Sequence, residues 1–420
     1  MLPSSMLRVI DQVSACFPQH PRLREMFARC FANTYETTLR PQADGSVHVI
    51  TGDIPAMWLR DSAAQVRPYL ALAKTDPAFT ALIAGVVRRQ MAFVAIDPYA
   101  NAFNEAANGR CHNRDATDMG PWIWERKYEL DSLCAPLLLA HDLWRETGDA
   151  SALDANFISA AHLIIETITR EQDHTASPYR FQRLEGPASD TLVNDGRGAP
   201  VGPTGMSWCG FRPSDDACRY NYLVPANMMA VVALRALAAL PLGDEVLKAK
   251  ALALAASLDA GIAAHGKVAH PRFGTVYAYE VDGLGHHHFM DDANVPSLLS
   301  LPYLGYCAKD DPVYLATRAL VLSDANPYFH RGLAAKGIGS PHTPEHSIWP
   351  IALCMQGLTS TSRDEQMALL ETLLATDAGT GLMHESFHKD DPTTFTRPWF
   401  AWANSLFAEF VMALAQPGGA

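Results

Sequence analysis

Apolar side chains recur at helical spacing along nearly the whole chain, and this pattern limits the fold more than any other feature. Leu7, Ile10 and Val13 share one face of a predicted helix. Many later segments are rich in Ala and Leu and poor in charge, as expected where a helix is covered on most sides. The same spacing predicts helices at 27–35, 62–73, 78–95, 128–147, 151–170, 217–240, 244–264, 292–306, 311–323, 346–358, 364–375 and 399–415.

Strand signals are few and short. Residues 46–51 and 275–281 alternate in polarity, which predicts hairpins carried on loops and not a sheet core. The helices come in adjacent pairs without a separating linker, although 420 residues would ordinarily suggest roughly two or three domains. We therefore predict one all-α domain over residues 1–420, its helix pairs closed into a toroid. The long connections, expected on one face and predicted to carry function, are 99–127, 174–216, 265–291, 324–345 and 377–398.

Composition narrows the functional classes. The chain carries 33 Lys and Arg against 45 Asp and Glu, a formal net charge of -12, and 48% of its residues are hydrophobic. The apolar content supports a large core and excludes a disordered chain. The negative balance argues against nucleic acid and against an anionic membrane surface as partners, because both attract a basic face.

The cysteines and the apolar segments indicate in which cellular compartment the protein is expected. Eight cysteines are scattered without a CxxC pair, which predicts reduced thiols and a reducing compartment. The N-terminal residues lack a signal-peptide pattern. The longest apolar stretch, 223–242, is interrupted by Asn227 and Arg235, so a buried helix explains it better than a membrane span. We predict a cytoplasmic protein; a leader removed during maturation would place it in the periplasm instead.

Three segments carry most of the candidate chemistry. In the first, 51–65 (TGDIPAMWLRDSAAQ), Trp58, Arg60 and Asp61 stand where a loop meets a helix expected to begin near residue 61. One interpretation is that Asp61 caps this helix. The other is that Trp58 forms an apolar platform while Arg60 and Asp61 bind sugar hydroxyls. The segment alone leaves both open.

The second segment, 208–219 (WCGFRPSDDACR), contains the adjacent carboxylates Asp215 and Asp216. Acidic residues at a helix N-terminus stabilise the helix dipole. Among aromatic neighbours, however, burial and a like charge would both raise the pKa of one carboxyl. A carboxylic acid kept protonated near neutral pH is what a glycosidase general acid requires.

The third segment, 381–404, contains Glu385 between His384 and His388. A carboxylate there would suit a general base that activates water. A single Glu is, however, ordinarily an exposed surface residue, so the segment alone does not decide between these interpretations.

Metal sites receive little support from the sequence. The run 286–288 (HHH) cannot place three adjacent rings on one ion from regular structure, and no acid or Cys partner lies at helical spacing. Residues 290–296 (MDDANVP) lack the ligand spacing of an EF-hand, and Asp291 or Asp292 is expected to cap the next helix. We predict no metal and no cofactor.

Five motifs occur in order along the chain: 51–62 (TGDIPAMWLRDS), 124–132 (WERKYELDS), 210–216 (GFRPSDD), 289–297 (FMDDANVPS) and 339–344 (GSPHTP). Together they resemble glycoside hydrolase family 125, the bacterial and fungal exo-α-1,6-mannosidases. The resemblance runs from about residue 27 to residue 410. It implies an (α/α)6 barrel, a metal-independent hydrolase that inverts anomeric configuration, and a mannose-containing oligosaccharide as substrate. We expect a monomer or a simple homo-oligomer.

The resemblance also implies catalytic residues. The family's acid lies in the RPSDD motif, and similar inverting barrel enzymes such as trehalases have an Arg four residues after the acid. Arg219 follows Asp215 at that spacing. The resemblance therefore implies Asp215 as general acid, with Asp216 as its rival, and Glu385 as general base. Such an inverting pair lies roughly 6.5–9.5 Å apart, which leaves room for the attacking water.

A subsite for the terminal mannose should combine aromatic faces with charged side chains that bind hydroxyls. Glu129 and Asp131 stay open between a supporting and a purely structural role. The residues expected in the subsite are Trp58, Arg60, Asp61, Trp208, Arg212, His342 and Trp399.

Three alternatives remain at this point. A sugar epimerase on the same barrel would use His pairs for proton transfer, with His342, His384 and His388 as candidates. A non-catalytic glycan-binding protein would need neither carboxylate. A calcium-dependent α-mannosidase would bind an ion and the substrate together, so its activity would be sensitive to chelators.

Overall fold

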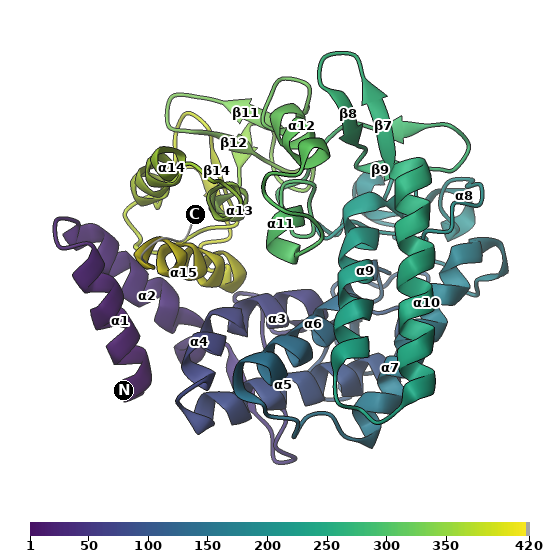
Figure 1. The fold of residues 1–420 in the computed structure, drawn as a ribbon, viewed down its shortest axis with the longest axis horizontal. Helices are drawn as coiled ribbons and strands as arrows, with labels where there is room; N and C mark the ends of the chain where they lie inside the picture. The colour runs from purple at the N-terminus through teal and green to yellow at the C-terminus, as the bar shows by residue number, and fades with distance from the viewer. Residues whose placement is uncertain (417–420) are drawn as a thin grey trace.

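Helices dominate the structure, as the apolar spacing predicts. The computed structural model describes residues 1–416 (Figure 1). Its helices are α1 (Ser4–Cys16), α2 (Pro21–Thr37), α3 (Leu59–Val66), α4 (Leu70–Ala73), α5 (Pro77–Ile96), α6 (Leu130–Thr147), α7 (Ala155–Arg170), α8 (Val193–Gly196), α9 (Val224–Ala239), α10 (Glu245–Gly261), α11 (Leu301–Leu304), α12 (Pro312–Val321), α13 (Pro350–Leu358), α14 (Arg363–Ala375) and α15 (Ala401–Ala415).

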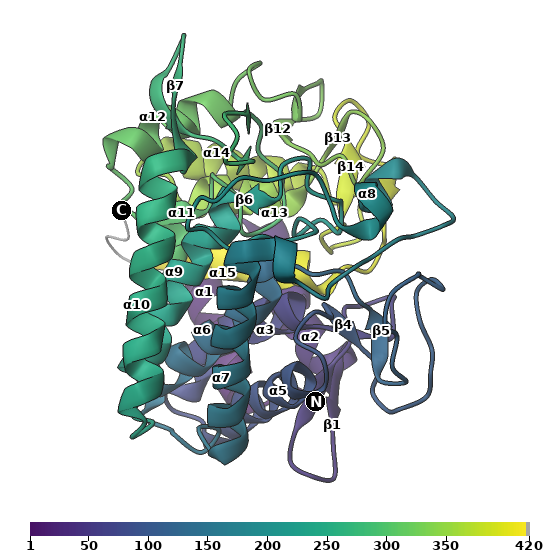
Figure 2. The same cartoon turned by 90° about the vertical axis from the view of Figure 1, so that its right-hand side faces the viewer.

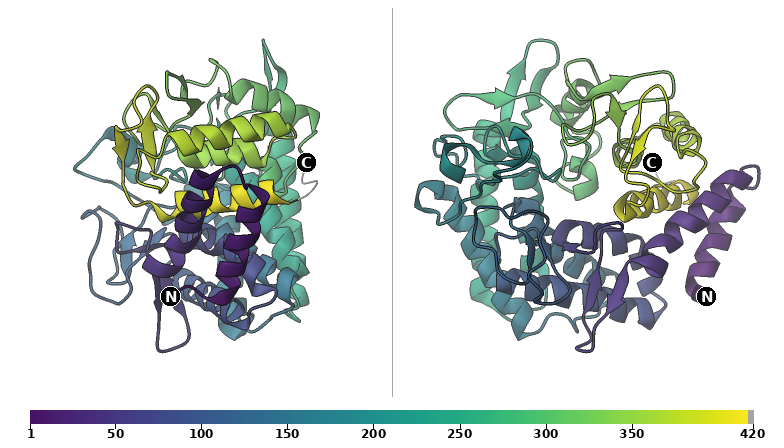
Figure 3. Two further views of the ribbon diagram at one scale, coloured as in Figure 1. Left: turned by 90° about the vertical axis from the view of Figure 1, so that its left-hand side faces the viewer. Right: turned by 180° about the vertical axis from the view of Figure 1, so that it is seen from behind.

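An inner set of helices surrounds the centre of the molecule. Among residues 1–416, α3 packs on α6, α6 on α9, and α9 on the short α11, while α13 packs on α15 and α15 returns to α3. A second set lies outside the first, with α2 on α15, α5 on α6, α10 on α9 and α14 on α13. Figure 3 shows the pairs distributed around a common centre, with the N-terminal helices beside α15.

The inner helices are apolar because neighbours cover them on most sides. The predicted buried helix in 223–242 is confirmed as α9, which buries 13 of its 16 residues. Its one buried amide, Asn227, accepts from the Ser207 amide at 2.8 Å and donates to the Ser207 carbonyl at 3.0 Å. The polar interruption in the apolar run therefore anchors the loop that precedes the RPSDD motif.

Helix α5 also has the length and composition of a membrane span. Of its most apolar window, 61% is buried inside the structure, where α5 packs against α4, α6 and α7. In this structure it is a core helix.

The strands are short and lie in the loops. Within the described residues they form antiparallel sheets of two or three strands. The two predicted hairpins are confirmed as β1–β2 and β7–β8. In Figure 2 the loops with β4, β5, β13, β14 and α8 extend from the same side of the helices. The strands are β1 (Leu39–Pro41), β2 (Val47–Val49), β3 (Met57–Trp58), β4 (Ala102–Phe103), β5 (Ile123–Glu125), β6 (Tyr222–Leu223), β7 (Lys267–His270), β8 (Gly274–Tyr277), β9 (Glu280–Val281), β10 (His287–His288), β11 (Phe329–Arg331), β12 (Lys336–Ile338), β13 (Ser347–Ile348), β14 (Ser386–His388) and β15 (Phe395–Thr396).

Three helix predictions need correction. The helix predicted at 217–240 begins only at residue 224, because 222–223 pair with β9. The segment 292–306 is mostly non-helical, since Pro296 cannot continue a helix and Asp291 bonds the amides of residues 298 and 299 instead. Asp61 is not a cap: α3 begins at Leu59, and Asp61 Oδ2 accepts from Thr51 Oγ1 at 3.0 Å.

Candidate active site

A cavity of about 780 Å³ lies on the loop side of the helices. Its lining comes from the 51–61 segment, from four of the five predicted long connections, and from Asn294, Trp349 before α13, Phe400 before α15 and Trp402 inside α15. Within the described residues, 265–291 is the connection that contributes none. Four of the five long connections therefore meet at one cavity.

Asp215 lies in a tight hairpin that carries the RPSDD motif. Phe211 and Ala217 form an antiparallel bridge, and the Cys218 amide donates to the Gly210 carbonyl at 2.9 Å. Asp215 itself has a left-handed φ of 68°, a conformation that Asp adopts more readily than most residues with a side chain. Asp215 lines the cavity from this turn.

Two donors and several charges surround Asp215. Asn101 Nδ2 donates to Asp215 Oδ1 at 3.1 Å, and Lys127 Nζ donates to the Asp215 carbonyl at 2.6 Å. Burial raises the pKa of Asp215, but Lys127, a hydrogen bond with Glu129 and the charge of Arg60 outweigh burial and leave this pKa below its ordinary value. Burial and repulsion from Asp215 raise the pKa of Glu129 well above its ordinary value, despite Arg60. The two carboxyl groups therefore titrate as a pair.

Asp216, the rival acid, is 1% exposed and lies outside the lining of the cavity in the described chain. Its Oδ2 accepts from Ser214 Oγ at 3.1 Å and lies 3.8 Å from His342 Nδ1. Burial raises the pKa of Asp216 to about 6, with His342 opposing the increase and Asp292 adding to it. A raised pKa suits a general acid, but access favours Asp215, because a proton donor must reach the glycosidic oxygen.

Glu385 reaches the same cavity from the connection between α14 and α15. It immediately precedes β14, which pairs with β13 and β15. Glu385 Oε1 lies 3.5 Å from Arg397 Nη1, and Arg397 Nε donates to Asp53 Oδ1 at 2.9 Å. Glu385 is 7% exposed. The carboxylate is thus paired with a cation and shielded from bulk solvent, as suits a base that activates one water.

Arg60 and Asp61 lie at the floor of the cavity, at the start of α3. Arg60 Nη1 donates to Glu129 Oε2 at 2.6 Å and to Asp131 Oδ2 at 2.9 Å, and Arg60 Nη2 lies 3.2 Å from Asp61 Oδ1. Burial raises the pKa of Asp61 despite this cation. Asp61 Oδ1 and the ring nitrogen of Trp58 are buried without a hydrogen-bond partner in residues 1–416. Unpaired polar atoms that line a cavity are suited to bind ligand hydroxyls.

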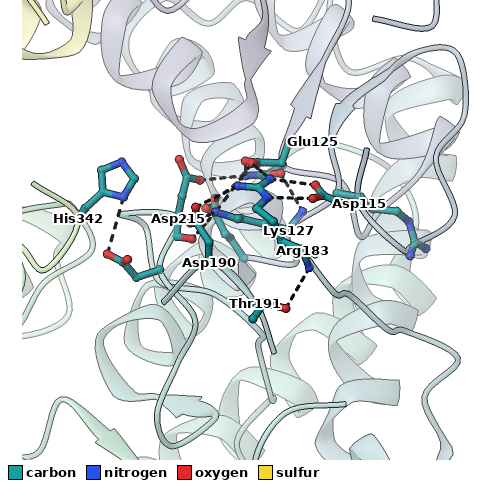
Figure 4. A network of polar contacts seen from close by, with 12 residues as sticks. Asp115, Glu125, Lys127, Arg183, Asp190, Thr191, Asp215 and His342 are labelled. Carbon is teal, nitrogen blue, oxygen red and sulfur yellow. Dashed lines mark hydrogen bonds and ion pairs between the residues drawn. The ribbon is translucent and has the colours of Figure 1, made fainter. Parts of the chain in front are cut away.

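Figure 4 shows an ion-pair network beside Asp215. Arg183 Nε and Nη2 each donate to one oxygen of Asp115 at 2.8 Å, and Arg183 Nη2 also reaches Glu125 Oε1 at 2.7 Å. Lys127 Nζ donates to Asp190 Oδ1 at 2.9 Å. These pairs join the 99–127 and 174–216 connections. Because Arg–carboxylate contacts of this kind are strong and directional, they hold the wall beside Asp215 in place.

Six predicted site residues line this one cavity: Trp58, Arg60, Asp61, Asp215, His342 and Glu385. They come from four separate segments of the chain. The structure therefore brings the candidate acid, the candidate base and four expected sugar-binding residues together.

Three other expected sugar-binding residues lie elsewhere. Trp208 is fully buried and stacks on His174, with ring centroids 3.5 Å apart. Arg212 is 6% exposed, and its Nε donates to Glu280 Oε1 at 2.6 Å. Trp399 is half-buried and outside the lining of the cavity in the described chain. This corrects the expectation for all three: Trp208 and Arg212 support the acid-bearing hairpin from within the core.

The lining side chains that sequence reasoning did not single out include Trp349, Arg397, Phe400 and Trp402. The aromatic run at 399–402 was the signal for the last two. Its orientation depends on a tertiary contact: Gly52, with φ 125°, lies so close to the chain that a Cβ would be 2.5 Å from the Trp399 carbonyl oxygen. That contact sets which rings of the run face the cavity.

Within the described residues His342 and His112 line the cavity, whereas His384 and His388, the other two candidates of the epimerase alternative, do not. His384 is 1% exposed and stacks on Phe395 at 3.7 Å, and His388 lies outside the lining of the cavity within the described residues. His286 Nδ1 contacts Asp282 Oδ2 at 2.6 Å. Among residues 1–416, no group of three or more His, Cys, Asp or Glu is placed to bind a metal ion.

Known proteins share this sequence and fold. A family described as metal-independent alpha-mannosidase (GH125) matches residues 20–412. Meiotically up-regulated gene 157 protein of Schizosaccharomyces pombe is 43% identical over 419 residues, covering 94% of this chain and 82% of the relative. One solved structure is a metal-independent α-mannosidase of Streptococcus pneumoniae in a non-productive complex with α-1,6-mannobiose. Its sequence is 50% identical to this chain, and the two structures superpose with a TM-score of 0.96 over 98% of this chain and 99% of that chain.

A more distant solved glycosidase shares the fold alone: it is 16% identical, with a TM-score of 0.56 over 94% of this chain and 98% of that chain. The family match spans nearly the whole chain and includes every residue that lines the cavity. The chain therefore belongs to GH125, the family of metal-independent α-mannosidases.

Proposed function

We propose that this protein is an inverting, exo-acting α-mannosidase that releases non-reducing terminal α-1,6-linked mannose from oligosaccharides. One observation carries the proposal: Asp215 and Glu385, 170 positions apart in the sequence, both line a single cavity among side chains suited to bind a sugar. Hydrolysis of a glycosidic bond needs two carboxyl groups in complementary roles.

In the proposed reaction Asp215 protonates the glycosidic oxygen while Glu385 removes a proton from a water. That water attacks the anomeric carbon from the opposite face, so the product is released with inverted configuration. Arg397 Nη1, 3.5 Å from Glu385 Oε1, orients the carboxylate of the base for the attack.

Terminal mannose would bind at the floor of the cavity. Asp61 Oδ1, which lies 3.2 Å from Arg60 but accepts no hydrogen bond from the described residues, and the ring nitrogen of Trp58 offer an acceptor and a donor to vicinal hydroxyls. The rings of Trp349, Phe400 and Trp402 line the same cavity and suit the apolar face of a pyranose. A closed end built from such groups favours release of one terminal residue over cleavage within a chain.

The linkage rests on the relative. The Streptococcus pneumoniae protein was solved with α-1,6-mannobiose, and it is 50% identical to this chain over 98% of its length. We extend that ligand to this protein as the substrate of first choice.

The architecture and setting belong to the same proposal. We infer that the inner and outer helix sets form an (α/α)6 barrel and that residues 1–420 make up one catalytic domain. One continuous cluster of buried side chains, running from Met6 to Leu414, supports both inferences. We further propose a monomer or simple homo-oligomer in the cytoplasm, where the thiols, such as the buried Cys30 and Cys354, would stay reduced.

Hydrolysis of α-1,6-mannobiose, compared with its α-1,2 and α-1,3 isomers, tests the proposal. NMR detection of the first-formed anomer reports the stereochemistry. We expect cleavage of the α-1,6 isomer with initial release of β-mannose, insensitive to chelators. Retention of configuration, or an intact α-1,6 linkage, would overturn the proposal.

Two isosteric variants separate this function from its alternatives. Asp215→Asn and Glu385→Gln should each abolish most hydrolysis, whereas His384→Gln, at a site behind the cavity, should leave the chemistry in place. If Glu385→Gln kept full activity while a His342 variant lost it, an epimerase-type mechanism would be favoured. A non-catalytic glycan-binding protein would show binding and no turnover in the parent.

A further inference from the structure

Asn101 joins Asp215 to two carboxyl groups, Glu125 and Glu129, that have no role in the proposed mechanism. Its side chain is fully buried, and its Oδ1 accepts from the Lys127 amide at 3.0 Å, which fixes the orientation of the amide group. Its Nδ2 then faces Asp215 Oδ1 at 3.1 Å, Glu125 Oε2 at 3.1 Å and Glu129 Oε1 at 3.4 Å. An amide has two hydrogens, so it cannot neutralise three ionised carboxylates.

The charges around Glu129 are also unbalanced. The groups that face the pair Glu129 and Asp215 are Arg60 and Asp61 from α3, Asp131 and Ser132 from α6, Asn101, Glu125 and Lys127 from the 99–127 connection, and His342. Glu125 is paired with Arg183. Two cations, Arg60 and Lys127, therefore remain for several buried carboxylates, and Lys127 is also bonded to Asp190 at 2.9 Å. Buried charges without partners are costly, so the group retains a proton.

The location of that proton follows from the contacts. Glu129 Oε1 and Asp215 Oδ1 share the Asn101 Nδ2, at 3.4 and 3.1 Å, and burial with mutual repulsion raises the pKa of Glu129. Lys127 lies against the Asp215 backbone and favours an ionised Asp215. The resting pair is therefore a Glu129 carboxylic acid that donates to an Asp215 carboxylate.

We propose that Glu129 stores the proton that Asp215 delivers to the leaving group, and that Asn101 holds the two carboxyl groups in contact. This inference rests on the proposed function, in which Asp215 is the general acid. It makes Glu129 and Asn101 positioning residues, since both act on substrate through Asp215.

The proton steps balance as follows. The O–H bond of Glu129 breaks as an O–H bond forms on Asp215. That bond then breaks as the proton moves to the glycosidic oxygen, which departs with the electron pair of the bond to the anomeric carbon. Both carboxyl groups are then ionised, and solvent restores one proton, while Glu385 returns to solvent the proton taken from water.

The basic limb of the pH profile of kcat/KM tests this inference. Glu129→Gln removes the stored proton, and Asp215 then has no second carboxylate whose charge would raise its pKa, so the acid form of Asp215 is lost at lower pH. We expect the limb to move down by about one pH unit and kcat at pH 7 to fall about tenfold. Asp142→Asn is the matched control, because Asp142 is a buried carboxylate of α6 paired with Arg67 at 2.9 Å outside the lining of the cavity in the described chain, and it should leave the limb near its parental position. An unmoved limb in folded Glu129→Gln, or an equal movement in Asp142→Asn, would overturn the inference.

A second measurement does not depend on the folding of that variant. Infrared spectra of the full-length parent at neutral pH report protonated carboxylic acids through their C=O stretch, and 13C labelling of the Glu or of the Asp carboxyl carbons shifts the bands of that residue type alone. If Glu129 stores the proton, one such band shifts when the Glu carboxyl groups are labelled. Bands that shift only with labelled Asp would place the proton on Asp215 and overturn the inference. A parent that fails to cleave mannobiose would instead refute the proposed function, so the two failures are distinguishable.

Discussion

Replacing Glu280 by Gln tests how the acid-bearing hairpin is held. Glu280 is fully buried and accepts from Arg212 Nε at 2.6 Å and from the amides of Arg219 and Tyr220 at 3.1 Å each. Burial would raise the pKa of Glu280, but Arg212 and His288, whose Nδ1 lies 3.9 Å from Glu280 Oε2, lower it from 4.5 to about 2. The carboxylate therefore stabilises the folded state.

The magnitude follows from linkage. At about 1.4 kcal/mol per pKa unit, this lowering contributes about 3 kcal/mol to the free energy of unfolding at pH 7. Because the folded pKa is depressed, the contribution is fully present above the unfolded value of 4.5 and is lost as the pH falls through about 2. At pH 3.5 about 2 kcal/mol of this contribution to the free energy of unfolding should remain.

Urea unfolding of the parent and of Glu280→Gln at pH 7 and pH 3.5 measures these contributions. We expect the variant to be less stable by at least about 3 kcal/mol at pH 7, since Arg212 also loses its partner, and the difference to shrink by about 1.4 kcal/mol at pH 3.5. Glu371→Gln, whose parental side chain is 57% exposed, should change stability by less than about 0.5 kcal/mol. A difference that does not vary between the two pH values would refute the assigned ionisation of Glu280.

Three further predictions concern the site. Asp215→Asn should lower kcat on mannobiose by about 10²–10⁴-fold. Hydrolysis of an activated aryl mannoside should fall much less, because a good leaving group does not need protonation by an acid. Equal losses on both substrates in steady-state assays would contradict the role of Asp215 as general acid. Arg397→Met removes the cation that lies 3.5 Å from Glu385 and is bonded to Asp53, and it should lower kcat/KM by about tenfold because the base loses a contact that orients it. A kcat/KM equal to that of the parent would exclude this role. Gly52→Ala should destabilise the protein by about 1–3 kcal/mol in thermal unfolding. Gly52 has a φ of 125°, and a Cβ added at this position would lie 2.5 Å from the Trp399 carbonyl oxygen, so there is no room for a side chain. Stability equal to that of the parent would show that the loop relaxes freely.

Several features of the fold could be predicted because their signals are local. The apolar stretch at 223–242 predicts a buried helix, and α9 confirms it with 13 of 16 residues buried. The alternating segments at 46–51 and 275–281 predict hairpins that the structure contains. Helix boundaries failed where a tertiary contact took over, as at residues 222–223, which pair with β9.

The candidate site was predicted unevenly for the same reason. Asp215 and Glu385 follow from motifs of a known family, and the structure brings both to one cavity. The motif could not show that Trp208 stacks on His174 in the core. An aromatic residue in a functional motif carries no local mark of whether it faces the ligand or supports the loop from behind.

The amino-acid sequence by itself determined that the chain is helical, that its long connections carry the chemistry, and which two carboxylates are the candidates for acid and base. These properties depend on neighbours a few positions away, through side-chain periodicity and contiguous motifs. Only the tertiary structure decided that the carboxyl groups of Glu129 and Asp215 are buried together against the amide of Asn101. Burial and charge repulsion depend on distances in space between residues more than 80 positions apart, and no local pattern records them.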